Sequence, residues 1–522
     1  MEDAAAAEVE AAMHASKRRR VDDHQAPPGS GSRQEQRHRD DLIRQRLEAL
    51  RDLIGRRVDN VLIRRQHDAI DAILSLLPTS QEQVTLDDLI SRLPDDVLGA
   101  IISLLTTKDG ARTQVLSRRW RPLWRSAPLN LVADCNLVNG DSQKRIAVIS
   151  KILSSHPGPA RCFLLRQIRM PDSLGEIDGW FRSRALDNLQ ELEVTYSTAS
   201  GDIVYPLPPP VLRFSPTLRV VKFGCCRFPD VTVPTFPHLK RLTLYSTAIS
   251  EDSLHNLLSA CIALESLSLR YPIGIGCLRI SSLTLRSMDF YASRTEECLQ
   301  ELIIEDVPCL ERLIPLDPDD GPATIQVIRA PKLKILGLLS EGISTLSIGT
   351  TIFQKMIAVT LTTRMNTMKI LVLDSVGPNL GKVVGFLKCF PCLEKLYVIT
   401  HPKKDMNNVQ MYDPIECLEL HLKEVVLKNY DGNKKSSIDF AKFFILNAKV
   451  LKKMEIGVVN RRNEIWMSYQ LRQLQVENSA SRDAQIELKR DVGQNFKHHN
   501  HAHDFSMADP FDRPCGRLLQ MY

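Results

Sequence analysis

Pro-His-Leu-Lys-Arg-Leu-Thr-Leu, residues 237–244, is the stretch that decides the fold of this chain. Its apolar residues stand at Leu239, Leu242 and Leu244, so that the second and third follow the first by three and five positions. This spacing occurs eleven times between residues 189 and 456, which is hard to attribute to chance. The triplets are Leu189/Leu192/Val194, Leu218/Val221/Phe223, Leu239/Leu242/Leu244, Leu264/Leu267/Leu269, Ile280/Leu283/Leu285, Leu299/Leu302/Ile304, Leu333/Leu336/Leu338, Met368/Leu371/Leu373, Leu393/Leu396/Val398, Leu422/Val425/Leu427 and Leu451/Met454/Ile456.

The spacing of these triplets indicates leucine-rich repeats. Between first residues the steps are 29, 21, 25, 16, 19, 34, 35, 25, 29 and 29, mostly in or near the range of about 20–29 residues for this repeat class. The short steps leave little room for a helix, so residues 136–411 are predicted to form an irregular solenoid of parallel strands with short helices in only some repeats. Thr243, Ser268 and Thr284 are expected on its exposed concave face, a surface suited to protein binding.

The composition argues against a membrane or secreted protein. Of the 522 residues, 43% are hydrophobic, and a formal charge of +6 is too mild to indicate nucleic acid. No apolar run reaches the length of about 18 residues that a membrane span needs, and the acidic N-terminus does not resemble a secretion signal. Cysteines inside apolar runs, such as Cys162, Cys261 and Cys309, are expected to be buried, reduced thiols. We therefore expect a soluble protein of the nucleus, the cytoplasm or both, with no membrane partner.

The first 83 residues are predicted to precede the folded part of the chain. Residues 1–40 are polar and predicted to be a disordered basic arm, in which Lys17, Arg18, Arg19 and Arg20 resemble a short nuclear import signal or are merely solvated. Over residues 41–83 apolar residues recur at helical intervals, which predicts an amphipathic helical extension. This extension is favoured as a packing element over a dimerisation or partner-binding helix.

Residues 84–131 have more apolar surface than so small a unit can bury. Pro94, Asp95 and Asp96 suit the first turn of a helix, and apolar stripes follow on either side of residues 106–110. A unit of about 45 residues is marginal by itself, so the surplus apolar surface favours docking to a partner.

The run LPDDVLGAIISLLTTKDGARTQVLSRRWRPLWRSAPLNL, residues 93–131, closely resembles the F-box of plant F-box proteins. The resemblance implies a face that binds the Skp-type adaptor of a ubiquitin ligase and, through it, a cullin. The residues that it implies form or support this face are Leu93, Pro94, Ile101, Val115, Leu116, Trp120, Leu123 and Trp124. A competing interpretation is nucleic-acid binding through Arg118, Arg119 and Arg121 beside Trp120, which the neighbouring acidic residues weaken.

Residues 412–490 resemble the FBD domain that follows an F-box and leucine-rich repeats in plant proteins. The resemblance rests on residues 420–425 and, more specifically, on FAKFFILNAKVLKKM at residues 440–454. Physically, these residues predict a helix leading into the last repeat strand, so the domain is expected to be an α/β cap on the solenoid.

Residues 491–522 are predicted to be a polar tail, whose histidines at 498, 499, 501 and 503 are expected to be solvated rather than metal-binding. Cys389 and Cys392 have redox or zinc spacing but no second pair, and are interpreted as structural. No metal, cofactor or catalytic set is predicted. The chain is therefore expected to be a non-enzymatic α/β multi-domain substrate receptor of a Skp-cullin-F-box ligase, or alternatively a non-degradative scaffold.

Overall fold

The computed structural model describes residues 95–115, 117–134, 137, 142–156, 158–168, 174–197, 204–291, 299–317, 322–400, 414–458, 464–490 and 502–512. The predicted arm over residues 1–40, the helices over 41–83, and Leu93, Pro94 and Leu116 lie outside these residues. The chain divides into two compact units, residues 1–104 and residues 105–522.

The described part of the first unit is helix α5 (Asp95–Leu104). Asp95 and Asp96 lie in its first turn, where a negative charge favours the helix dipole. Leu98 and Ile102, four positions apart, are both buried. The predicted helix over this part of the F-box segment is therefore present.

The second unit begins with two short helices, α6 (Thr107–Thr113) and α7 (Trp120–Ser126). Thr106 caps α6, because its Oγ1 accepts a hydrogen bond from the Asp109 amide at 3.3 Å and donates one to the Asp109 carboxylate at 2.7 Å. Such capping fixes where the helix begins.

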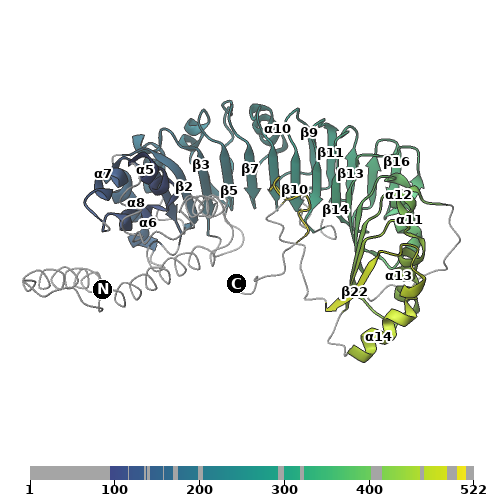
Figure 1. Ribbon diagram of the computed structural model, residues 1–522. Helices are drawn as coiled ribbons and strands as arrows, with labels where there is room; N and C mark the ends of the chain where they lie inside the picture. The colour runs from purple at the N-terminus through teal and green to yellow at the C-terminus, as the bar shows by residue number, and fades with distance from the viewer. Residues whose placement is uncertain are drawn as a thin grey trace, which may run out of the picture. The chain divides into compact units, whose positions relative to one another are not determined.

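Fourteen strands of the described residues form one parallel sheet, called the main sheet (Figure 1). Its register aligns the central apolar residue of successive repeats, so that Leu242, Leu267 and Met288 lie side by side. In sheet order the strands are β1 (Leu129–Ala133), β2 (Ala160–Ile168), β3 (Glu191–Tyr196), β5 (Val220–Gly224), β7 (Arg241–Tyr245), β8 (Ser266–Arg270), β10 (Ser287–Tyr291), β12 (Arg312–Pro315), β14 (Ile335–Leu339), β18 (Ile370–Gly377), β19 (Lys395–Thr400), β20 (Glu424–Tyr430), β21 (Lys453–Val458) and β22 (Gln485–Arg490).

A second sheet, rather than helices, forms the return path of the middle repeats. It comprises β9 (Cys277–Ser281), β11 (Glu301–Asp306), β13 (Thr324–Val327), β15 (Thr345–Ile348), β16 (Thr351–Gln354) and β17 (Ile357–Thr360). The smaller elements elsewhere are α8 (Ser142–Ser155), α9 (Leu174–Phe181), η1 (Arg184–Leu186), β4 (Tyr205–Pro206), η2 (Pro209–Phe214), β6 (Cys226–Arg227), α10 (Glu251–Ala260), α11 (Leu380–Cys389), α12 (Glu416–Leu420), α13 (Lys435–Asn447), α14 (Glu464–Gln473) and η4 (Val476–Asn478). The predicted α/β solenoid with helices in only some repeats is confirmed.

Two of the eleven predicted triplets were assigned to the wrong strand. In Ile280/Leu283/Leu285 the middle residue is 74% exposed, and the main-sheet strand β10 instead buries Met288 and Phe290 after Leu285. The triplet Leu299/Leu302/Ile304 lies on β11 of the second sheet. Both sheets alternate apolar and polar residues, so the spacing does not distinguish them.

The corrected triplets restore a regular repeat. Between Leu264 and Leu333 the triplets missed the main-sheet strand β12, which follows Leu310 and buries Leu313. The triplets also did not cover β1, β2 and β22 of the same sheet. The repeats then start at Leu264, Leu285, Leu310 and Leu333, with steps of 21, 25 and 23 residues. The irregular steps of 16, 19 and 34 therefore came from counting two second-sheet strands, β9 and β11, as repeats.

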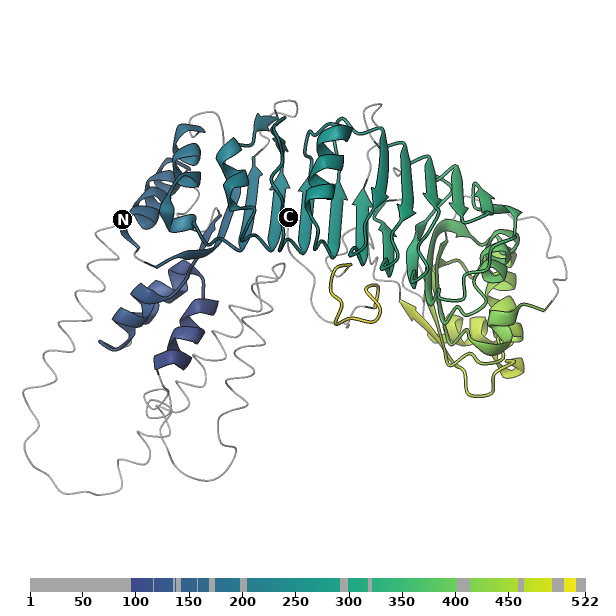
Figure 2. The same cartoon turned by 90° about the horizontal axis from the view of Figure 1, so that it is seen from above.

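The expectation for the concave face was wrong at Ser268, which is only 2% exposed. Thr243 is half-buried on β7, and Thr284 is half-buried before β10, where its hydroxyl donates to the Leu264 carbonyl at 2.9 Å. The Ser268 hydroxyl accepts a hydrogen bond from Arg270 Nε at 3.3 Å. Residues 502–512, predicted to belong to a polar tail, lie on the inner side of the arc of strands (Figure 2). Ala502 and Phe511 of this stretch are buried, so it is packed rather than solvated.

Candidate docking surfaces

Val115 is the most exposed of those predicted F-box docking residues that the structure describes. It follows helix α6 and is 84% exposed, which is unusual for a large apolar side chain. Leu123 on α7 and Ile101 on α5 are each half-buried. These residues therefore keep apolar surface available for a partner.

The two tryptophans lie inside the second unit instead of on its surface. Trp120 is 8% exposed and Trp124 is 7% exposed. The Trp124 ring packs closely on Gly110 of α6 and meets the ring of His156 edge-on at 5.0 Å. These contacts of Trp124 join α6, α7 and the residue that follows α8.

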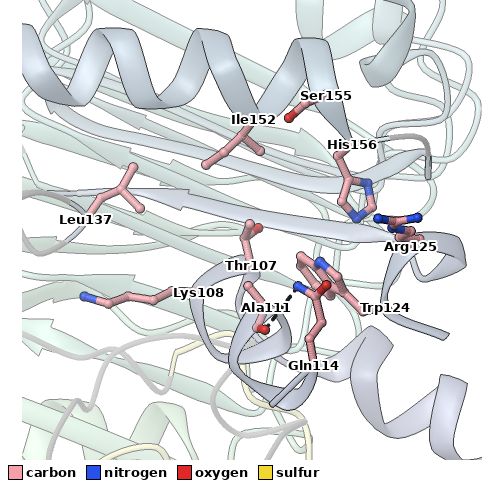
Figure 3. A pocket seen from close by; sticks show the side chains of 10 residues that line it. All are labelled: Thr107, Lys108, Ala111, Gln114, Trp124, Arg125, Leu137, Ile152, Ser155 and His156. Atoms are coloured by element: carbon pink, nitrogen blue, oxygen red, sulfur yellow. Dashed lines mark hydrogen bonds between the residues drawn. The ribbon is translucent and has the colours of Figure 1, made fainter. Parts of the chain in front are cut away.

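A pocket of about 400 Å³ lies between α6, α7 and α8 (Figure 3). Its polar side chains include Lys108 and His156, which stand at opposite ends of the pocket. His156 Nδ1 accepts a hydrogen bond from the Gly158 amide at 3.1 Å, and the ring packs on Trp124. The Ser155 hydroxyl, also in the lining, donates to the Lys151 carbonyl at 2.6 Å.

The described residues contain no group of three or more metal-ligating side chains. Cys389 is buried, and burial raises the pKa of its thiol to about 12, which disfavours the reactive thiolate. Within the same residues, no helix is long and apolar enough to cross a membrane.

The concave face of the main sheet is charged over its first strands. Glu193 on β3 contacts Arg166 of β2 and Lys222 of β5, each at 2.8 Å. Burial would raise the pKa of Glu193, but Lys222 and Arg166 outweigh burial and hold the pKa below its usual range. Glu193 is therefore ionised and fixed between two cations.

A row of alternating charges follows the edge where the strands begin. Each residue stands one position after the first apolar residue of its repeat, so neighbours along the row pair across adjacent strands. The pairs are Lys240 with Glu265, Arg286 and Lys334 with Glu311, and Lys369 and Lys423 with Glu394. Cross-strand ion pairs favour the correct register.

From β12 onward the concave face becomes apolar. An apolar patch is formed there by Ile314, Leu316, Ile335, Leu338, Ile370, Val372, Tyr397 and Val426. Val372 and Tyr397 point away from the solenoid core, because each stands between two core residues on its strand. The patch is nevertheless buried, since Ala502 and Phe511 pack on it.

Three models of known families match this chain. The F-box domain matches residues 90–131, the LRR repeats of FBD-associated F-box protein At5g56370 match residues 177–398, and FBD matches residues 412–456. The chain is a plant F-box protein with leucine-rich repeats and an FBD domain. The resemblance drawn from the sequence is thereby confirmed.

Relatives of this F-box protein occur in Arabidopsis thaliana. F-box/FBD/LRR-repeat protein At3g26920 is 24% identical over 72% of the chain and 91% of the relative. Putative F-box/LRR-repeat protein At3g58880 is 34% identical over 38% of the chain, and F-box/LRR-repeat protein At3g03360 is 30% identical over 44% of it. The chain spans only 47% of the length of each of these last two relatives.

The FBD region of this F-box protein continues the main sheet. Strands β20 and β21 are separated by α13, and β22 pairs with β21 as the last strand of the sheet. β22 is mostly exposed and carries Glu487 and Lys489, which pair at 2.7 Å. A charged terminal strand discourages edge-to-edge association, which agrees with the predicted role as a cap.

Sequence reasoning missed the concave residues that hold residues 502–512, chiefly Arg312 and Lys395. Both occupy ordinary outward positions of repeat strands, and nothing local indicates a partner more than a hundred positions later. The available signal was Phe505 and Phe511, two aromatic residues in an otherwise polar stretch.

Proposed function

We propose that this chain is the substrate-receptor subunit of a Skp-cullin-F-box ubiquitin ligase. Its F-box would dock to a Skp-type adaptor and through it to a cullin, while the concave face of the repeats holds a target protein. The observation that carries the proposal is the F-box match over residues 90–131 in a chain that also has a leucine-rich-repeat sheet.

Val115 supports the docking half of the proposal. An apolar side chain that is 84% exposed on a well-packed pair of helices gains free energy when a partner covers it. Trp120 and Trp124 keep those helices in place from within. Docking therefore depends on a preformed surface and requires no catalytic group.

The concave face supports the receptor half. Tyr245, Tyr271 and Tyr291 form a row of contacting rings on β7, the residue after β8, and β10, with centroids 5.7 Å and 4.1 Å apart. Tyr245 remains 38% exposed. Aromatic residues are enriched at protein interfaces, so this row is a candidate contact for a target protein.

The mechanism would be proximity. A receptor that holds a target beside a charged conjugating enzyme raises the effective concentration of the target lysine. No side chain of the receptor needs to act on the reacting bond, so we infer that the chain is an adaptor and not an enzyme. We keep the basic run Lys17 to Arg20 as a proposed nuclear import signal.

The nucleic-acid alternative receives little support from α7 and its flanks. Arg118 and Arg121 are exposed, but Trp120 is buried and has no free face on which a base could stack. A non-degradative scaffold would use the same repeat surface as a substrate receptor. It would differ from a substrate receptor only in that it does not bind the adaptor.

Co-purification with a plant Skp-type adaptor tests the proposal. Val115→Glu is expected to weaken adaptor binding at least tenfold, because it buries a charge at the interface. Ile262→Glu changes another exposed apolar residue, at 62% exposure in the repeats, and should leave adaptor binding unchanged. Failure of the unaltered chain to bind the adaptor, or equal losses for both variants, would contradict the proposal.

A further inference from the structure

Residues 502–512, Ala-His-Asp-Phe-Ser-Met-Ala-Asp-Pro-Phe-Asp, are called the docked segment. The segment lies on the concave face and contacts strands from β7 to β19. Arg241 donates to the His503 carbonyl at 3.4 Å, and Tyr397 donates to Asp509 at 2.8 Å. The segment therefore crosses the part of the face where polar residues give way to the apolar patch.

Arg312 holds the main chain of the docked segment. Its Nη1 donates to the carbonyls of Ala502 at 3.0 Å and Asp504 at 2.9 Å, and its Nη2 donates to that of Met507 at 2.6 Å. Arg312 is only 5% exposed. A buried guanidinium needs partners for its donors, and the three hydrogen bonds resolved for the Arg312 side chain all go to this segment.

Phe505 is held by cations. The guanidinium of Arg286 lies 4.1 Å from its ring centroid, and that of Arg312 lies 5.1 Å away. Both distances are within the range for a cation–π contact. Since main-chain carbonyls and an aromatic ring are bound together, the site recognises a peptide.

The far end of the docked segment combines a charge and an aromatic ring. Lys395 Nζ lies 2.9 Å from the Asp509 carboxylate, which also accepts the Tyr397 hydrogen bond. Phe511 is 2% exposed, and its ring lies 5.8 Å from the Tyr397 ring. This end therefore requires a carboxylate followed two positions later by an aromatic residue.

His503 reaches the polar end of the site. Its Nε2 lies 3.3 Å from the Asp289 carboxylate, which also pairs with Arg270 at 2.9 Å. Ser287 donates to the Ala502 carbonyl at 2.8 Å. Side chains of β7, β10, β12 and β19 thus act on one continuous stretch of eleven residues.

We propose that this part of the concave face is the target-binding site and that the docked segment is its built-in competitor. The inference rests on the proposed function, which supplies the need for a target. The fitting target is an extended peptide with an aromatic residue, a carboxylate four positions later and a second aromatic two positions after that, as in Phe505, Asp509 and Phe511. A competitor on the same chain acts at an effective concentration of order millimolar. A target peptide with low affinity for the site therefore does not displace the docked segment.

A labelled peptide of residues 502–512 tests the competitor directly by fluorescence anisotropy. The full chain, purified with its adaptor, is compared with a full-length release variant carrying Phe505→Ala and Phe511→Ala. The release variant should bind the peptide at least tenfold more tightly than the unaltered chain, whose site is filled. A scrambled peptide of the same composition should bind neither protein.

A charge exchange makes the result specific to this site. Lys395→Glu in the release variant should abolish binding of the unaltered peptide, and a peptide with Asp509→Lys should restore it. Equal binding by the unaltered chain and the release variant, no binding by a release variant that still melts cooperatively, or indifference to the charge exchange would each overturn the inference. Adaptor binding by the same preparations reports separately on the proposed function.

Discussion

Replacing Phe511 with Ala tests whether residues 502–512 dock as one unit. Phe511 is 2% exposed and packs on the apolar patch of the concave face. Full burial of such a side chain contributes about 1.5–3 kcal/mol. Taking roughly 2 kcal/mol as lost, and about 1.4 kcal/mol for each factor of ten, we expect the undocked population to rise about 30-fold.

Hydrogen exchange at the other end of the segment measures this rise. The Ser506 amide donates to the Asp504 carboxylate at 3.1 Å, and the Met507 amide donates to the Asp504 carbonyl at 3.2 Å. If the segment opens as a unit, exchange at both amides should accelerate about 30-fold, because local opening sets the exchange rate. Val115→Ala is the control and should change neither rate. Unchanged exchange at Ser506 and Met507 in the Phe511 variant would refute docking as a unit.

Three further substitutions test the packing and charge of the solenoid. Burial would raise the pKa of Asp289, but His503, Arg270 and Ser268 outweigh burial and lower it from 3.8 to about 2, a shift that corresponds to about 2 kcal/mol of stability. A lowered carboxyl pKa stabilises the fold only while the group is ionised, so Asp289→Asn should reduce the free energy of urea unfolding by about 2 kcal/mol at pH 7. This loss of stability should become smaller as the pH falls from 4 toward 2. A loss that stays constant over this pH range would contradict an ionised Asp289. In Gly110→Ala the new Cβ would lie 2.3 Å from the Trp124 ring, so the protein should lose about 1–3 kcal/mol of stability and melt at a lower temperature. In the control Gly99→Ala the new Cβ meets nothing within 4 Å, so the melting temperature should not fall. Gly337 has a φ of +141°, and an added Cβ would lie 2.5 Å from Val372, so Gly337→Ala should lower the free energy of urea unfolding by about 2 kcal/mol or more. The control is Gly276→Ala, whose new Cβ would lie 3.5 Å from its nearest neighbour. An equal or smaller loss of stability for Gly337→Ala than for Gly276→Ala would contradict this packing.

The repeat architecture could be predicted from the sequence because its signal is local. Each main-sheet strand needs apolar residues at fixed spacing to reach the core, and Leu242, Leu267 and Leu396 all fulfil this need. The second sheet could not be separated from the main sheet, because Leu302 and Ile304 have the same spacing as two apolar residues of a main-sheet strand. Only the pairing of β11 with β9 and β13 assigns it.

The docking surfaces were predicted unevenly. The F-box pattern predicted helices that the structure contains. Spacing cannot tell which large residues a small unit keeps inside, and it did not distinguish buried Trp124 from exposed Val115. The docked segment depends on contacts such as Arg312 with Met507, which are 195 positions apart. Its contacts with the sheet involve residues far away in the sequence, so sequence pattern could not place it.

The measurement that tests the central claim most directly is assembly of the ligase core in solution. The full chain is mixed with a plant Skp-type adaptor and the adaptor-binding domain of a cullin, and the mass of the resulting species is measured by light scattering after size exclusion. A substrate receptor predicts one species that contains one copy of each protein, and the Val115→Glu variant should remain outside it. Separate elution of the unaltered chain from an intact adaptor–cullin pair would contradict the claim.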